Sequence, residues 1–94
     1  MCLPSTRQVH VVLKALEGQN QPVEPVNLIE RMKDVCLSMG DEKKLYIYAP
    51  RSLGSVLDDL IDSRKIARNN GYKLTQLGVK ELTSTSELVA KAVA

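Results

Sequence analysis

The segment from Leu53 to Ile61 carries the most regular apolar pattern in the chain and constrains its fold more than any other feature. Its apolar residues recur at steps of three and four, which is typical of a helix with one apolar face. Such a helix must bury that face against other elements of a core. Two residues are candidates for its start: Pro50 at the first helical position, or Ser52 as the N-cap.

The residues after this helix predict a β-hairpin. Two short stretches with strand-forming residues, 65–68 and 72–74, flank Asn69-Asn70-Gly71. Asn-Gly favours a tight turn, because both residues tolerate a positive φ.

Two helices are expected before this unit. Apolar residues at helical spacing predict one over about residues 5–17, opened by a capping box from Ser5 to Gln8. A second helix is expected to begin at Pro25 and to end at Gly40. Residues 45–48 are rich in strand formers but few, so we expect an extended linker there.

One more helix is expected after the hairpin. Thr75 can cap it, and Ser84 with Glu87 forms a second capping-box pair that can restart it. With 94 residues, of which 44% are hydrophobic, the chain is expected to form a single domain over 1–94. The predicted fold class is mainly α with a small β-hairpin, in the order α-α-α-β-β-α.

The composition argues against several classes of protein. Two cysteines and one histidine are too few for a disulfide scaffold or a zinc site. We expect Cys36 to be a core residue, Cys2 a reduced and inert thiol, and His10 a structural or surface residue. No catalytic motif is present, so we expect a non-enzymatic protein without a cofactor or metal. No secretory signal or membrane span is visible, which predicts a cytoplasmic protein.

Residues 72–82 resemble the Y-x-L-T-x-x-G-x-x-x-L run of PadR-like, MarR-like and related winged-helix regulators. In those families the run joins the second wing strand to the next helix. Upstream, Leu57, Leu60 and Ile66 are similar to the end of the recognition helix and the first wing strand. The resemblance covers about residues 50–82 and implies a winged helix-turn-helix fold that binds double-stranded DNA as a transcription regulator. One departure is Ser63-Arg64-Lys65-Ile66, where many relatives have a glycine turn, and it leaves the exit of the third helix open.

Positive charge is concentrated in the predicted hairpin, although the net charge of the chain is only +2. Residues 64–73 contain basic residues and no acidic ones. Such a hairpin suits contacts with phosphates or insertion into a minor groove, although charge also protects exposed strand edges. The hairpin residues expected to contact DNA are Arg64, Lys65, Arg68, Asn69, Asn70 and Lys73.

The third helix is expected to read base edges with its N-terminal residues. These are Arg51, Ser52 and Ser55, of which Arg51 suits a bidentate contact with guanine. Lys43 and Lys44, in the preceding turn, are expected to reach the DNA backbone.

Three aspartates on the same helix oppose this interpretation, because a duplex repels negative charge. Either Asp58, Asp59 and Asp62 point away from DNA, or one of them accepts from a cytosine amine. The alternative function is a winged-helix module that docks a partner protein through this acidic side. The aspartates could also suggest a hard metal ion, but a solvated helix face is the simpler interpretation.

Residues 75–94 form a longer and more apolar C-terminal segment than a small winged helix needs. Four apolar residues are expected to be exposed on a monomer, which usually marks an interface: Leu82, Leu88, Val89 and Val93. Relatives in the resembled families pair through this helix and the first one, so a homodimer on two DNA half-sites is expected. A frayed tail is the alternative.

Overall fold

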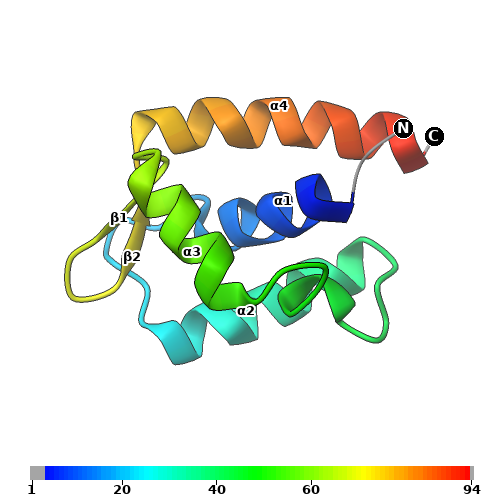
Figure 1. Ribbon diagram of the computed structural model, residues 1–94, viewed down its shortest axis with the longest axis horizontal. Coiled ribbons are helices and arrows are strands. Elements are labelled where there is room, and N and C mark those ends of the chain that lie inside the picture. Colours follow the sequence, from blue (N-terminus) through cyan, green and yellow to red (C-terminus); the bar gives the residue numbers. More distant parts are fainter. Residues whose placement is uncertain (1–3, 94) are drawn as a thin grey trace.

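The computed structural model describes residues 4–93 as four α-helices, one short 3-10 helix and one antiparallel hairpin (Figure 1). This confirms the predicted fold class, mainly α with a small β-hairpin, and it is compatible with a winged-helix layout. In chain order the elements are α1 (Pro4–Leu16), α2 (Pro25–Ser38), the 3-10 helix η1 (Leu45–Ile47), α3 (Leu53–Asp62), β1 (Ile66–Arg68), β2 (Tyr72–Leu74) and α4 (Gln76–Val93).

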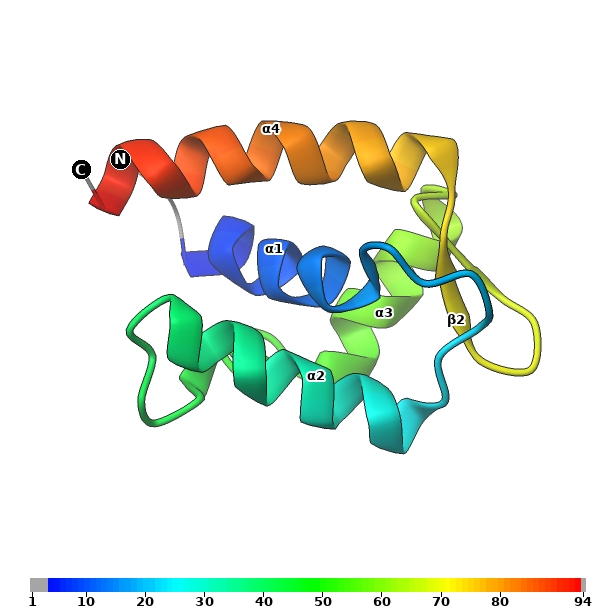
Figure 2. The same ribbon diagram turned by 180° about the vertical axis from the view of Figure 1, so that it is seen from behind.

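Helix α1 lies at the centre of the molecule, between α4 on one side and α2 on the other (Figures 1 and 2). Because it is covered from several sides, its residues 11–13, 15 and 16 are at most 1% exposed. The stripe predicted on α3 supplies Val56, Leu57 and Leu60 to the same core. Cys36 of α2 is also fully buried there, which confirms its prediction as a core residue.

The start of α3 is fixed to α1 by one buried side chain. Gln8 Nε2 donates to the carbonyl oxygen of Arg51 at 2.6 Å, and the Arg51 N–H donates to Gln8 Oε1 at 3.2 Å. The predicted capping box is therefore wrong: Ser5 already lies inside α1, and the Gln8 amide binds a distant backbone instead. A fully buried amide needs both partners, and Arg51 provides them.

The segment 45–48 does not form the predicted extended linker; it contains the 3-10 helix η1. The buried Asp41 carboxylate accepts from the N–H groups of Leu45 and Tyr46, both at 3.0 Å, and so holds this turn. Burial alone would raise the pKa of Asp41, but the hydrogen bonds from the backbone outweigh it and lower the pKa. Ile47, fully buried, anchors the turn in the core.

The hairpin pairs Ile66 with Leu74 and Arg68 with Tyr72, as the Asn-Gly turn predicted. Asn70 has φ 56° and Gly71 has φ 135°, so the turn uses the left-handed region that these residue types tolerate. A single bridge from Val23 to Tyr72, which the sequence did not predict, adds the segment between α1 and α2 to the hairpin edge. Its two backbone hydrogen bonds are both 2.8 Å long.

Helix α4 begins as predicted but does not restart. The Gly78 N–H donates to Thr75 Oγ1 at 3.1 Å, which confirms Thr75 as the cap. The helix then runs without a break to Val93, so the predicted second cap at Ser84 is wrong. Leu82 and Thr85, which flank that point, are both buried where α4 packs against α1, and this packing favours a continuous helix across it.

Candidate nucleic-acid interface

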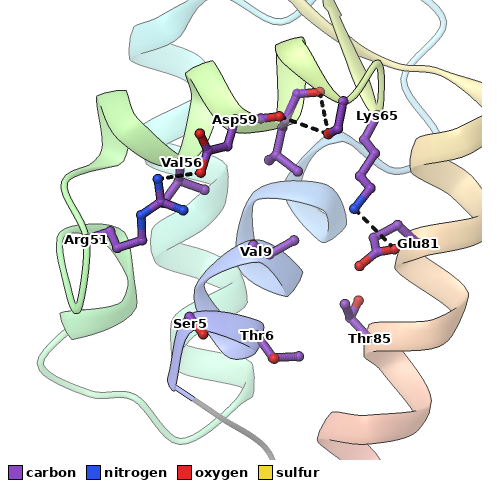
Figure 3. A pocket seen from close by; sticks show the side chains of 11 residues that line it. Ser5, Thr6, Val9, Arg51, Val56, Asp59, Lys65, Glu81 and Thr85 are labelled. Atoms are coloured by element: carbon purple, nitrogen blue, oxygen red, sulfur yellow. Dashed lines mark hydrogen bonds and ion pairs between the residues drawn. The ribbon is translucent and has the colours of Figure 1, made fainter.

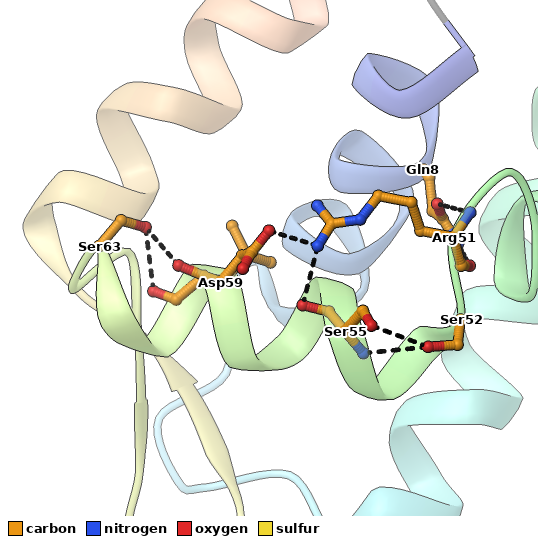
Figure 4. A network of polar contacts seen from close by, with 7 residues as sticks. Gln8, Arg51, Ser52, Ser55, Asp59 and Ser63 are labelled. Atoms are coloured by element: carbon orange, nitrogen blue, oxygen red, sulfur yellow. Dashed lines mark hydrogen bonds and ion pairs between the residues drawn. The ribbon is translucent and has the colours of Figure 1, made fainter.

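The residues expected to read bases lie at the N-terminal end of α3. Ser52 is the N-cap, because its Oγ accepts from the Ser55 N–H at 3.3 Å, and it also donates to Ser55 Oγ at 3.0 Å (Figure 4). Of the two predicted starts, the structure therefore has Ser52 and not Pro50. Both serine side chains are exposed but already serve the cap.

The Arg51 side chain turns back along α3 instead of pointing away from it. Its guanidinium forms an ion pair with Asp59 and also donates to the carbonyl oxygen of Ser55 at 3.4 Å (Figure 4). The Arg51 and Asp59 side chains are 42% and 60% exposed, so the pair lies at the surface. Exposed pairs of this kind contribute about 0–1 kcal/mol, which a nucleic acid can compete with.

The three aspartates of α3 are all exposed. Asp59 is neutralised by Arg51, whereas Asp58 and Asp62 take part in none of the ion pairs found among residues 4–93. All three aspartates lie in the C-terminal half of this helix, so the ion pair removes one of three negative charges there, and the N-terminal half carries none.

The hairpin presents most of its predicted DNA contacts to solvent. Arg64, Arg68, Asn69, Asn70 and Lys73 are exposed. The Arg68 guanidinium lies 6.0 Å from the centre of the Tyr72 ring, where a cation–π contact orients it without neutralising it. We call the five exposed residues Arg64, Arg68, Asn69, Asn70 and Lys73 the basic hairpin.

Lys65 differs from the other basic residues of this segment. It precedes β1, is only partly exposed, and its Nζ lies 3.4 Å from Glu81 Oε2 of α4. This ion pair ties the hairpin base to α4, so Lys65 is less available to DNA than the sequence suggested.

The exit of α3, left open by the sequence, has Arg64 in the left-handed backbone region. Arg64 has φ 62° and its carbonyl oxygen accepts from Thr75 Oγ1 at 2.5 Å. Ser63 Oγ donates to the Asp59 carbonyl oxygen at 2.8 Å and stabilises the last turn. The strained conformation therefore places the Arg64 side chain at the hairpin base.

The predicted residues do not form one cluster. The basic hairpin extends beside the C-terminal end of α3, whereas the turn with Lys43 and Lys44 lies at the opposite end of the molecule (Figure 1). Helix α3, whose ten residues extend about 15 Å, and η1 both lie between the hairpin and that turn in the chain. The arrangement suits a long contact along α3 better than a compact pocket.

Sequence reasoning missed Gln8 and Asp59 as parts of this interface. Gln8 positions the Arg51 backbone, and Asp59 holds its side chain. Arg51 lies outside the helix, so helical spacing gave no signal that it pairs with Asp59.

A polar cavity of about 280 Å³ lies between the N-terminal part of α1, α3 and α4 (Figure 3). Arg51 with Asp59 lines one side of it, and Lys65 with Glu81 lines another. Among residues 4–93, no group of His, Cys, Asp and Glu side chains has the arrangement of a metal site. No helix in that range is both long and apolar enough to cross a membrane.

His10 is a buried structural residue, one of its two predicted states. Its Nδ1 lies 3.0 Å from Thr85 Oγ1 of α4, and that hydroxyl donates to the Leu82 carbonyl oxygen at 3.1 Å. Burial lowers the pKa of His10; the positive charge of Lys14 lowers it further, and the Glu17 carboxylate partly offsets this.

We therefore expect acidification to destabilise the fold through His10. The unfolded chain takes up the proton first, at its ordinary pKa of 6.5, so the free energy of unfolding falls as the pH drops below that value. Urea unfolding of the wild type and of His10→Gln between pH 7.5 and 5 measures this. The variant should lack the part of the pH dependence that is due to His10, and parallel curves for the two proteins would contradict the assignment.

The apolar surface of α4 is smaller than predicted. Leu82 and Val89 are 4% and 8% exposed, because they pack toward α1, so their predicted exposure is wrong. Leu88 is exposed as expected, together with Leu77 and Val79. The Val93 side chain, Ala94 and Cys2 lie outside what the structure describes.

Comparison of the chain with family models, with curated proteins and with solved structures finds no match. The proposals below therefore depend on the geometry of this chain and on general physical chemistry.

Proposed function

We propose that the chain is a winged-helix domain that binds double-stranded DNA and regulates transcription as a homodimer. The exposed basic hairpin carries this proposal, since it extends beside α3 as a wing does beside a reading helix (Figure 1). Arg64, Arg68 and Lys73 would contact phosphates, and the Asn69-Asn70 tip would enter a minor groove.

Helix α3 would enter the major groove by its N-terminal end. There Arg51, Ser52 and Ser55 are exposed, residues 51–57 include no acidic side chain, and Asp59 is paired with Arg51. Asp62, at the other end of the helix, would then stay away from the groove. Lys43 and Lys44 would reach the backbone on the far side of α3, and Lys65 would add charge while it remains tied to Glu81.

The homodimer part of the proposal rests on α4. Leu77 and Leu88 are 50% and 44% exposed and lie eleven residues apart, which places them on one face of this helix, and pairing through that face would remove them from water. Two copies would place their α3 helices in half-sites about 34 Å apart.

Fluorescence anisotropy with labelled random duplexes at low salt tests the function. We expect binding that weakens steeply as salt is added, because Lys and Arg release counterions from the phosphates. Arg68→Gln should weaken binding to all sequences alike, whereas Arg51→Gln should relax the preference for selected sequences. Absence of binding to every duplex would overturn the proposal, and equal effects of the two variants would contradict the roles of Arg51 and Arg68.

Docking of a basic protein is the second candidate function. Asp58 and Asp62 support it, because both are exposed and neither takes part in an ion pair within residues 4–93. A basic partner that is retained by the wild type and lost by Asp58→Asn with Asp62→Asn would favour this function over DNA binding.

A further inference from the structure

The Arg51–Asp59 ion pair lies where base contacts are proposed, and the backbone and the side chain of Arg51 are held by different groups. The Arg51 backbone is held on both its N–H and its carbonyl oxygen by the buried Gln8 amide. Its guanidinium, by contrast, contacts two surface groups among residues 4–93, the Asp59 carboxylate and the Ser55 carbonyl oxygen (Figure 4). The side chain can therefore leave Asp59 while its anchor point stays in place.

The pair changes what Arg51 offers to DNA. A guanidinium paired with a carboxylate contributes little net attraction for a phosphate. If Arg51 moves to a phosphate, Asp59 is left unpaired beside the polyanion, close to the exposed Asp58. Both effects disfavour a contact between Arg51 and a phosphate, which is the contact that every DNA sequence offers.

We propose that Asp59 is a selectivity-determining residue that suppresses non-specific DNA binding by holding Arg51. The inference rests on the proposed DNA-binding function and assigns a role to one of its acidic residues. Discrimination between ligands arises as much from weakening the wrong complex as from strengthening the right one. The basic hairpin supplies affinity, and the pair keeps Arg51 from adding to that affinity on every sequence.

Asp58 provides a matched control. It is the neighbouring residue on the same exposed part of α3, and its carboxylate is not paired with Arg51. Asp59→Asn and Asp58→Asn remove the same charge from nearly the same place, so a difference between them isolates the ion pair.

The test is anisotropy of a labelled random-sequence duplex over a salt series with wild type, Asp59→Asn and Asp58→Asn. Asp59→Asn should bind about eightfold more tightly than Asp58→Asn at 0.1 M salt, because Arg51 gains one phosphate contact. The slope of log K against log salt should steepen by about 0.9 in Asp59→Asn relative to Asp58→Asn. In an Arg51→Gln background the two aspartate variants should bind equally, because a difference between them that came from the ion pair disappears with Arg51.

The outcomes separate this inference from the function on which it rests. Duplex binding with equal affinities and equal slopes for Asp59→Asn and Asp58→Asn overturns the role of Asp59 and leaves DNA binding standing. A difference that persists in the Arg51→Gln background also overturns it. Absence of duplex binding by all the proteins overturns both proposals.

Discussion

Replacement of Gly78 by alanine is expected to destabilise the fold more than the same replacement at any other glycine of residues 4–93. A Cβ at Gly78 would overlap the carbonyl oxygen of Lys65 and would approach Leu74 Cδ2 to 3.0 Å. That carbonyl oxygen accepts from the Thr75 N–H at 3.2 Å, so it cannot rotate away without losing a hydrogen bond. The start of α4 and the entry to β1 would have to separate.

We expect Gly78→Ala to lower the free energy of unfolding by about 3 kcal/mol, at the upper end of the cost of overpacking. For a domain of this size, 1 kcal/mol corresponds to about 4–8 °C in Tm, so the melting temperature should fall by at least 12 °C or so. Thermal unfolding followed by circular dichroism measures this shift.

Gly54→Ala is the matched control. Gly54 lies in α3, is exposed, and has open space where a Cβ would be placed. Alanine there should stabilise the helix by up to about 1 kcal/mol, because it is the better helix former. If both variants shifted Tm in the same direction by similar amounts, the steric overlap expected at Gly78 would be contradicted.

Gly78 also gives a physical reason for the glycine in the run from Tyr72 to Leu82. The Thr75 hydroxyl caps α4 and also donates to the carbonyl oxygen of Arg64, just after the end of α3. This double contact brings α4 so close to Lys65 that only glycine fits. The resemblance noted in the sequence therefore coincides with a steric requirement of this chain.

Features that depend on local residues were predictable. The apolar stripe of α3, the caps Ser52 and Thr75, and the Asn-Gly turn each need only a few neighbouring residues. The structure contains all of them close to the predicted positions.

Features that depend on distant partners were not predictable. Segment 45–48 has the composition of a strand, but the Asp41 carboxylate and the burial of Ile47 make part of it a 3-10 turn. Gln8 reads as part of a capping box, but its amide is buried against Arg51. Periodicity alone could not tell which apolar residues of α4 face α1, so Val89 was assigned to the surface.

The candidate interface also has one part that depends on local residues and another that depends on distant partners. Its basic hairpin could be predicted from the sequence, because the Asn-Gly turn and the basic residues on either side of it are contiguous in the chain. The pairing of Arg51 with Asp59 and of Lys65 with Glu81 required the packed structure. Of the residues expected to contact DNA, these two cations form ion pairs with carboxylates within residues 4–93.

Neutralising the basic hairpin is expected to have the largest effect on DNA binding. Arg64, Arg68 and Lys73 are exposed and belong to none of the ion pairs found in the described part of the chain. If each neutralises one phosphate, each contributes a salt slope of about 0.9, or about eightfold in affinity at 0.1 M salt relative to 1 M. The triple variant Arg64→Gln, Arg68→Gln and Lys73→Gln should therefore bind duplex DNA several hundredfold more weakly, with a slope shallower by about 2.7.

A second triple variant separates position from net charge. Lys14→Gln, Lys80→Gln and Lys91→Gln removes three positive charges from exposed sites on α1 and α4. If DNA lies along α3 and the hairpin, this variant should lose only a small part of the affinity, because charges beyond about 10 Å are screened at 0.1 M salt. Equal losses in the two triple variants would mean that total charge, and not the hairpin, attracts DNA. The basic hairpin would then be a charged strand edge that keeps the sheet from pairing with other chains, which is the other physical reason for such residues.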